Sequence, residues 1–171
     1  LLAARNVIPA LNYVAGLDAD APDLEARGED GKKQFAGGEL PHRTLGIIGL
    51  GAIGSLVADT AIKLGMKVIG FDPEITVDAA WSLPSQVKKA HSIEEVLRAA
   101  DFVTLHVPLL DVTRKMVNAS RIKLMKNGAI LLNFSREGIV DNDAVLEALA
   151  TKHVRWYVCD FPARKLQGHP Q

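Results

Sequence analysis

The feature that most limits what this chain can fold into is a glycine pattern within an apolar segment, "GIIGLGAIGS" at residues 46–55. Gly49, Gly51 and Gly54 stand in the order G-x-G-x-x-G. Such a loop can hold a pyrophosphate, or it can be a tight connection between a buried strand and a helix. The segments on either side must decide between these two interpretations.

Apolar strand-like runs alternate with helical segments from residue 44 onward. After the glycines, apolar side chains recur from Ile53 to Leu64 at the spacing of one helix face. Ser92 and Glu95 have the spacing of a capping box. We expect strands at residues 44–49, 67–71, 102–107, 129–133 and 154–158, and helices at 53–64, 92–99 and 141–150. Strands that are apolar on both faces predict a parallel sheet between helices, a doubly wound α/β domain of the Rossmann type.

The first 42 residues do not follow this pattern. Residues 1–14 favour a short helix despite Pro9, and residues 16–42 are broken up by glycine and proline. The first residue is Leu1 rather than Met, and we interpret the sequence as a piece of a longer chain.

Composition excludes several classes of protein. The 171 residues contain 20 basic and 20 acidic side chains, so no net charge attracts the chain to nucleic acid or to an anionic membrane. No apolar stretch approaches the roughly 18 residues of a membrane span. Cys159 is the single cysteine, which excludes an internal disulfide and favours a reducing compartment such as the cytoplasm. We expect a soluble protein without a metal site.

An acidic residue at the end of the second strand favours dinucleotide binding. Asp72 lies 18 residues after Gly54, where a carboxylate can accept hydrogen bonds from the ribose of an adenosine. It would repel a 2′-phosphate, and the next residue is Pro73 rather than a cation. The spacing therefore predicts NAD rather than NADP as the cofactor.

Several motifs together resemble the nucleotide-binding domain of the NAD-dependent D-2-hydroxyacid dehydrogenases. They are "LGIIGLGAIG", "FDP" at 71–73, "HVPL" at 106–109, "NFSREGIVD" at 133–141 and "CDF" at 159–161. Within this family, "NVIPALNYVAG", "GKKQFAGGELPHRTLG" and "DAAWSLPSQVKKA" most resemble the D-3-phosphoglycerate dehydrogenase branch. The resemblance implies hydride transfer between a small 2-hydroxyacid and NAD, in a cytoplasmic homodimer or higher homo-oligomer.

The resemblance also implies roles for individual residues. Arg136 matches the arginine that holds the substrate, a task suited to a planar, bidentate cation. Asp160 matches the acid near the nicotinamide carboxamide. The implied cofactor-binding set is Gly49, Gly51, Ala52, Ile53, Gly54, Asp72, Pro73, His106, Val107, Pro108, Thr113, Phe134, Ser135 and Asp160.

The chain departs from the family pattern near its end. The family's proton-transfer histidine lies in a Pro-His-x-Gly segment, but His169 precedes a proline and does not match it. His106 resembles a cofactor-loop residue rather than the catalytic histidine. "CDFPARKL" has no glutamate for orienting that histidine, so we assign this role to no residue. We expect His42, His91 and His153 to be solvated or structural.

The resemblance leaves the substrate domain unaccounted for. Residues 1–15 would be a connecting helix with dimer contacts or, alternatively, a helix packed on the sheet of its own chain, and residues 16–171 the dinucleotide-binding domain. We expect this piece to bind NAD but to have little dehydrogenase activity alone. Two alternatives remain open: another D-2-hydroxyacid dehydrogenase, such as a glyoxylate or hydroxypyruvate reductase, and a non-catalytic NAD-sensing module like the related corepressors.

Overall fold

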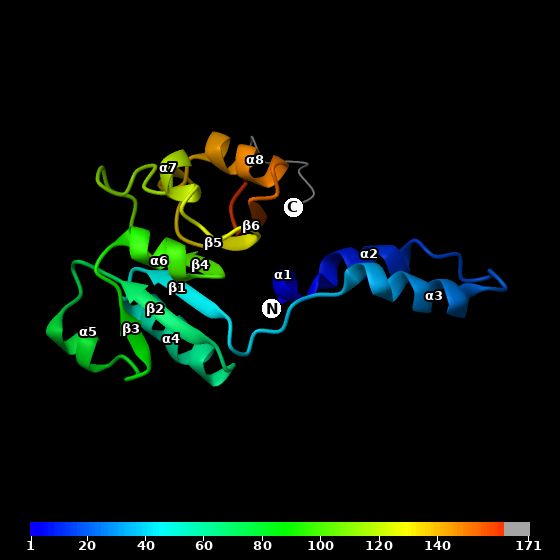
Figure 1. Cartoon of the computed structure of the whole chain (residues 1–171), viewed down its shortest axis with the longest axis horizontal. Coiled ribbons are helices and arrows are strands. Elements are labelled where there is room, and N and C mark those ends of the chain that lie inside the picture. Colours follow the sequence, from blue (N-terminus) through cyan, green and yellow to red (C-terminus); the bar gives the residue numbers. More distant parts are fainter. Residues whose placement is uncertain (163–171) are drawn as a thin grey trace. The chain divides into compact units, whose positions relative to one another are not determined.

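The chain is arranged in two compact units, which a computed structural model describes over residues 1–162. The first unit spans Leu1–Leu40 and the second begins at Pro41. The first unit is helical, and the second contains a parallel sheet with its covering helices (Figure 1).

The sheet of the second unit confirms the expected doubly wound fold. Its strands are β1 (Thr44–Ile48), β2 (Lys67–Phe71), β3 (Val87–Lys89), β4 (Phe102–Leu105), β5 (Ala129–Asn133) and β6 (Val154–Cys159). All neighbouring pairs are parallel, in the order β3-β2-β1-β4-β5-β6. The order reverses between β1 and β4, and in such sheets a crevice for ligands forms beyond the carboxyl ends of the strands at this point.

Apolar side chains fill both faces of the sheet, as the strand composition predicts. Leu45 and Ile47 of β1 pack in one cluster with Ala58 of α4, whereas Ile48 joins a second cluster with Val96 of α6. Successive strand residues point to opposite faces, so a strand that is apolar throughout must be covered on both sides.

Five α-helices accompany the sheet in the described part of this unit. They are α4 (Ala52–Lys63), α5 (Val77–Trp81), α6 (Ile93–Ala99), α7 (Ala119–Ile122) and α8 (Asn142–Ala150), with a short 3-10 helix at Glu137–Ile139. The expected cap of α6 is present, because the Ser92 hydroxyl accepts a hydrogen bond from the Glu95 N–H at 3.1 Å. The Glu95 carboxylate in turn accepts from the His91 N–H at 2.8 Å.

The buried face of α4 differs from the expected one. Gly54, Ala58 and Ala61 face the sheet, whereas Ile53 and Leu56 are exposed by 67% and 68%. Small residues allow the helix to approach the strands closely, so size rather than hydrophobicity decides which face is buried.

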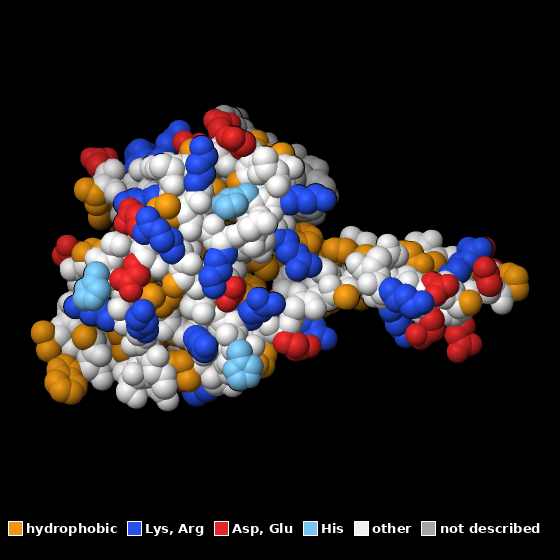
Figure 2. All heavy atoms as spheres, viewed as in Figure 1, with side chains coloured by type: hydrophobic (Ala, Val, Ile, Leu, Met, Phe, Trp, Pro, Cys, Tyr) orange, Lys and Arg blue, Asp and Glu red, His pale blue; other side chains and the backbone are white. Residues whose placement is uncertain are grey.

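Several short elements carried too little pattern to be predicted. Strand β3 has only three residues, two of them lysines, and helices α5 and α7 have five and four residues. In α5, Val77 and Trp81 are exposed by 71% and 85%, and hydrophobic side chains reach the surface over this helix (Figure 2).

The first unit is a helical hairpin. Its elements are α1 (Leu2–Arg5), α2 (Val7–Ala15), α3 (Leu24–Lys32) and a 3-10 helix at Lys33–Phe35. Asn6 adopts a left-handed conformation between α1 and α2, and Pro9 is tolerated in the first turn of α2, where an N–H has no partner within the helix. The Tyr13 hydroxyl donates to the Arg27 carbonyl at 2.9 Å, which joins α2 to α3. Separate roles for residues 1–15 and 16–171 stay a prediction. The two compact units of the structure meet at a different point, after Leu40.

A single carboxylate joins three segments of the chain at the end of the sheet where the strands begin. Asp101, just before β4, accepts a hydrogen bond from the Thr44 N–H at 2.8 Å and from Lys126 Nζ at 3.1 Å. Arg43 lies 4.0 Å away. Burial alone would raise the pKa of Asp101, but the Thr44 N–H and the two cations lower it overall.

We therefore expect Asp101→Asn to destabilise the fold at neutral pH by about 1 kcal/mol, a value reduced for partial solvent exposure. Because the folded-state pKa is lowered, this stabilisation is present above the unfolded pKa and is lost as the pH falls through the folded value. Urea unfolding of both proteins from neutral to acidic pH should show the difference shrinking below the ordinary aspartate pKa. Asp59→Asn, which removes an exposed pair with Lys63, is the control and should change stability little at either pH.

Candidate functional site

The glycine loop connects the carboxyl end of β1 to the first turn of α4, and two of its glycines are required by the fold. Gly49 has a φ of 94°, and a Cβ there would lie 2.5 Å from the carbonyl oxygen of His106. A Cβ on Gly54 would lie 2.0 Å from the carbonyl oxygen of Gly49. Both residues therefore allow backbone segments to approach more closely than any side chain permits.

Gly51 differs from its two neighbours, because a Cβ there would meet no atom within 4 Å. It is the N-cap of α4, and no side chain caps that helix end. The N–H groups of the first turn are thus left to a ligand at the positive end of the helix dipole. Exposed Ala52 and Ile53 flank this opening. Open space in front of unpaired N–H groups suits a pyrophosphate.

Asp72 lies directly after β2 and is joined to the glycine loop. Its Oδ2 accepts a hydrogen bond from the Leu50 N–H at 2.8 Å, and its Oδ1 accepts from the Glu74 N–H at 2.9 Å. Each carboxylate oxygen has a second lone pair that can accept from a ligand hydroxyl. Asp72 therefore holds the loop in place in addition to its predicted contact with ribose.

A cavity of about 560 Å³ begins at Asp72 and Pro73. Its lining is largely apolar, with Lys89 and His91 among the polar members; it comprises Leu50, Gly70, Phe71, Asp72, Pro73, Ile75, Ala80, Leu83, Pro84, Ser85, Val87, Lys89, Ala90 and His91. A flat apolar group attached to a sugar at Asp72 could occupy this space. Of these residues, the sequence predicts only Asp72 and Pro73 as part of a site, because β3 and α5 are too short to be recognised in it.

The loop after β4 supports the glycines with its backbone. The His106 N–H donates to the Ile48 carbonyl at 2.8 Å, and the Val107 side chain packs against the core. The His106 ring lies 3.0 Å from the Thr104 hydroxyl, and burial lowers the pKa of His106, which favours the neutral form of its imidazole. The Thr113 hydroxyl donates to the Pro108 carbonyl at 2.7 Å, which closes the loop.

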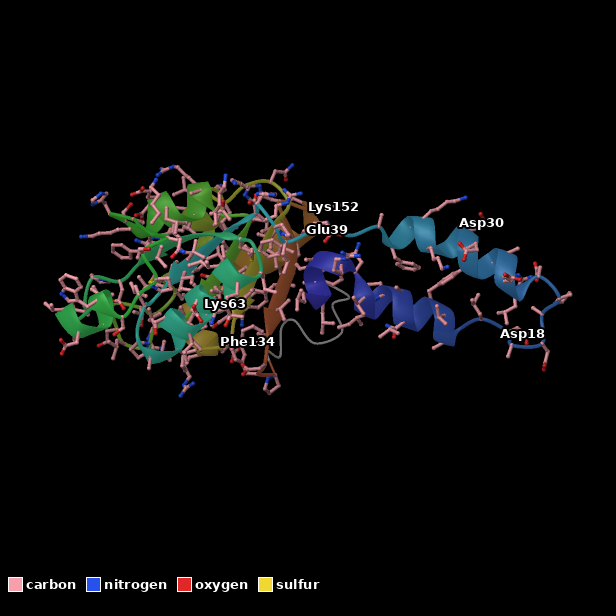
Figure 3. The ribbon with its side chains drawn as sticks, turned by 90° about the horizontal axis from the view of Figure 1, so that it is seen from below. Asp18, Asp30, Glu39, Lys63, Phe134 and Lys152 are labelled. Atoms are coloured by element: carbon pink, nitrogen blue, oxygen red, sulfur yellow. The ribbon has the colours of Figure 1, made fainter. Side chains whose placement is uncertain are left out.

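The turn after β5 carries Arg136. The side chain of Phe134 is 48% exposed and lies at the opposite edge of the second unit from Lys152 (Figure 3). The Ser135 hydroxyl donates to the Leu105 carbonyl at 2.7 Å, so the turn is joined to β4. Arg136 is exposed, and its guanidinium donates to the Ser135 carbonyl at 2.7 Å. Its remaining N–H groups can reach a ligand.

Asn133, the last residue of β5, was missed as a site residue. It is fully buried, its Oδ1 accepts from the Ser135 N–H at 3.1 Å, and its Nδ2 donates to the Arg136 carbonyl at 3.0 Å. A polar residue that ends the apolar run "AILLN" was the available signal.

Asp160 lies at the same end of the sheet as the turn after β5, because Asn133 and Cys159 are partners in β5 and β6, whereas the remaining histidines lie apart from these loops or outside the described residues. Asp160 is exposed directly after β6. The His153 ring lies 3.0 Å from the Ile122 carbonyl, which is a structural contact, and His42 is exposed. His169 lies outside the described residues. Within residues 1–162, no three His, Cys, Asp or Glu side chains are grouped to hold a metal ion, and no helix has the length and apolar character needed to cross a bilayer.

Fold and loop together define a dinucleotide-binding domain. Residues 10–169 match the family described as "D-isomer specific 2-hydroxyacid dehydrogenase, NAD binding domain". The chain belongs to this family and corresponds to its NAD-binding domain.

Individual relatives support the assignment. The chain is 44% identical over 129 residues to a D-3-phosphoglycerate dehydrogenase of Methanocaldococcus jannaschii, covering 75% of this chain and 24% of the relative. It is 41% identical over 142 residues to a D-3-phosphoglycerate dehydrogenase of Bacillus subtilis, covering 80% and 26%. Among solved structures, an NAD-dependent formate dehydrogenase from Staphylococcus aureus in complex with NAD has a TM-score of 0.78 at 28% identity, covering 99% of this chain and 48% of that one. The chain thus spans about a quarter of the length of these curated relatives.

The geometry predicts that two glycines of the loop have different roles, one in the stability of the fold and the other in NADH binding. Gly54→Ala should destabilise the fold by about 1–3 kcal/mol, because its Cβ collides with backbone. Gly51→Ala should fold normally but weaken NADH binding by about tenfold or more, because its methyl group occupies the space in front of the helix N-terminus. Thermal unfolding and NADH titration measure the two effects.

Gly28→Ala, at an open position of α3, is the matched control and should leave NADH affinity unchanged. Normal NADH binding by folded Gly51→Ala would contradict the position assigned to the pyrophosphate.

Proposed function

We propose that this chain is the cofactor-binding part of a dehydrogenase that oxidises D-3-phosphoglycerate to 3-phosphohydroxypyruvate with NAD. The observation that carries the proposal is an open helix N-terminus at Gly51 next to a carboxylate, Asp72, which is fixed by its hydrogen bond from the Leu50 N–H. The names of the relatives in M. jannaschii and B. subtilis support the substrate, as do the segments "GKKQFAGGELPHRTLG" and "DAAWSLPSQVKKA". This chemistry would place the protein in serine biosynthesis.

The residues that would hold NAD follow from the loops. N–H groups at the start of α4 would bind the pyrophosphate, and Asp72 would accept from the adenosine ribose. The apolar cavity beside Asp72 and Pro73 would take the adenine. Loops that carry His106–Pro108, Phe134–Ser135 and Asp160 would surround the nicotinamide half.

Arg136 would bind the substrate beside the nicotinamide. Bound NAD supplies the hydride acceptor for C2 of the hydroxyacid. The guanidinium of Arg136 would hold the substrate carboxylate and the C2 oxygen through paired hydrogen bonds. The hydroxyl proton must pass to a base, and we assign that role to no residue of this chain, since none of its histidines matches the Pro-His-x-Gly segment that carries the base in the family it resembles.

A homo-oligomer is part of the same proposal. Ile8, Leu11 and Val14 recur at helical spacing on α2 and are exposed by 55–62%. Exposed apolar residues at this spacing suit an interface with another copy of the chain. Cys159 is the single cysteine and so cannot form an internal disulfide, which suits a reducing compartment such as the cytoplasm.

Binding and turnover test separate parts of the proposal. The 171-residue chain should bind NADH but should not oxidise D-3-phosphoglycerate, because it would lack a substrate domain. The complete protein should prefer D-3-phosphoglycerate to glycolate and other small 2-hydroxyacids. Preference for an unphosphorylated acid would refute the substrate, and the absence of any turnover would favour an NAD-sensing role.

Replacement of Asp72 tests the cofactor assignment. Asp72→Ala should weaken NADH binding by about 10- to 100-fold, since it removes charge-assisted hydrogen bonds to ribose and the support of the Leu50 N–H. Asp72→Asn keeps an acceptor for Leu50 but removes the negative charge, so it should lose less NADH affinity and gain relative affinity for NADPH. Fluorescence titration of each variant with both cofactors measures the changes. Unchanged affinity for both cofactors in Asp72→Ala would show that the carboxylate does not contact ribose.

Arg136→Lys tests the substrate site in the complete protein. A lysine keeps the charge but not the two-pronged geometry, so kcat/KM for the hydroxyacid should fall by about 100-fold while NADH affinity changes little. Steady-state kinetics and NADH titration provide the two values. Exposed Arg98→Lys on α6 is the matched control and should alter neither.

A further inference from the structure

The turn that carries Arg136 is held by one buried amide. Asn133 accepts from the N–H of Ser135 and donates to the carbonyl of Arg136. These two backbone partners fix which end of the amide is oxygen and which is nitrogen. The oxygen and the nitrogen of the Asn133 side chain therefore each fix one backbone group of the turn.

The amide is itself held by the neighbouring strand. Its Nδ2 also donates to the Tyr157 hydroxyl at 3.2 Å. Both residues are buried, with exposed fractions of 0% for Asn133 and 7% for Tyr157. Tyr157 lies on β6, where its backbone partner in β5 is Leu131, two residues before Asn133. Residues two apart point to the same face of a sheet, so the phenol reaches the amide along that face.

The phenol is suited to a permanent link. Burial raises the pKa of Tyr157 to about 12, so the hydroxyl stays neutral at physiological pH. Without this acceptor, one N–H of the buried amide would lack a partner, which is costly enough to favour other orientations of the side chain. A reoriented amide would release the Ser135 N–H or the Arg136 carbonyl.

We propose that Tyr157 is a positioning residue, which acts through Asn133 to fix the Phe134–Arg136 turn against the nicotinamide half of the cofactor and the substrate. The inference rests on the proposed function, since that function places NAD beside the turn. It assigns Tyr157 a role without any contact to NAD or substrate. The adenosine half binds at β1 and β2 and does not depend on this link.

Tyr157→Phe removes only the hydroxyl and tests the inference in the 171-residue chain. Affinity for ADP-ribose, which lacks nicotinamide, should stay within about twofold, whereas NADH affinity should fall by about threefold to tenfold, the equivalent of one hydrogen bond. The emission of bound NADH, which reports the surroundings of the nicotinamide, should shift toward that of free NADH. Tyr13→Phe, which removes a tyrosine hydrogen bond in the first unit, is the matched control and should change neither affinity.

The outcomes separate this inference from the proposed function. Equal losses of ADP-ribose and NADH affinity would show a general structural role and overturn it, as would unchanged NADH affinity and emission. Failure of the unmodified chain to bind either compound would instead refute the proposed function. In the complete protein, Tyr157→Phe should raise the KM for the hydroxyacid more than it lowers kcat, and an unchanged KM would also contradict the inference.

Discussion

The close contact between the first turn of α4 and the end of β1 determines the rest of the site. Only a missing side chain at Gly54 lets the helix begin against the carbonyl of Gly49. Because the helix begins there, its N-terminal N–H groups lie where the strand order reverses, which is the position at which sheets of this kind bind ligands. The small residues Ala58 and Ala61 continue the same close approach along the helix. Packing and the proposed binding of the pyrophosphate therefore depend on the same backbone contact.

Side chains around this contact serve mainly to hold backbone. Asp72 accepts the Leu50 N–H, Ser135 donates to the Leu105 carbonyl, and Thr113 donates to the Pro108 carbonyl. Each of these bonds fixes a loop at the carboxyl edge of the sheet. A loop held in this way loses little conformational entropy when a ligand binds, so the binding free energy is not reduced by ordering the site. The site is thus preorganised by hydrogen bonds between side chains and backbone.

The sequence predicted the parts of the fold that have a strong period. Five of the six strands, the capped helix α6 and the glycine loop were correctly placed, because each combines an apolar pattern with a recognisable end signal. Strand β3 and helix α5 were missed because three and five residues are too short to show a period. The buried face of α4 was wrong because periodicity counts apolar residues, whereas close packing selects small ones. The candidate site could be listed from motifs, but the link from Asn133 to Tyr157 joins residues 24 apart and arises only when β5 and β6 pair.

Charged side chains at the amino ends of the strands have different partners from those at the carboxyl ends. At the amino ends, Asp101 has Lys126 and Arg43 beside it, so its charge is balanced within the protein. At the carboxyl ends, Asp72 accepts hydrogen bonds only from backbone N–H groups within the described residues, and the guanidinium of Arg136 donates to a backbone carbonyl. Neutral partners leave both charges uncompensated, and hydrogen bonds that involve a charge are stronger than neutral ones. In the function we propose, an anionic substrate at Arg136 and ribose hydroxyls at Asp72 would supply the partners that these two groups lack within the described residues.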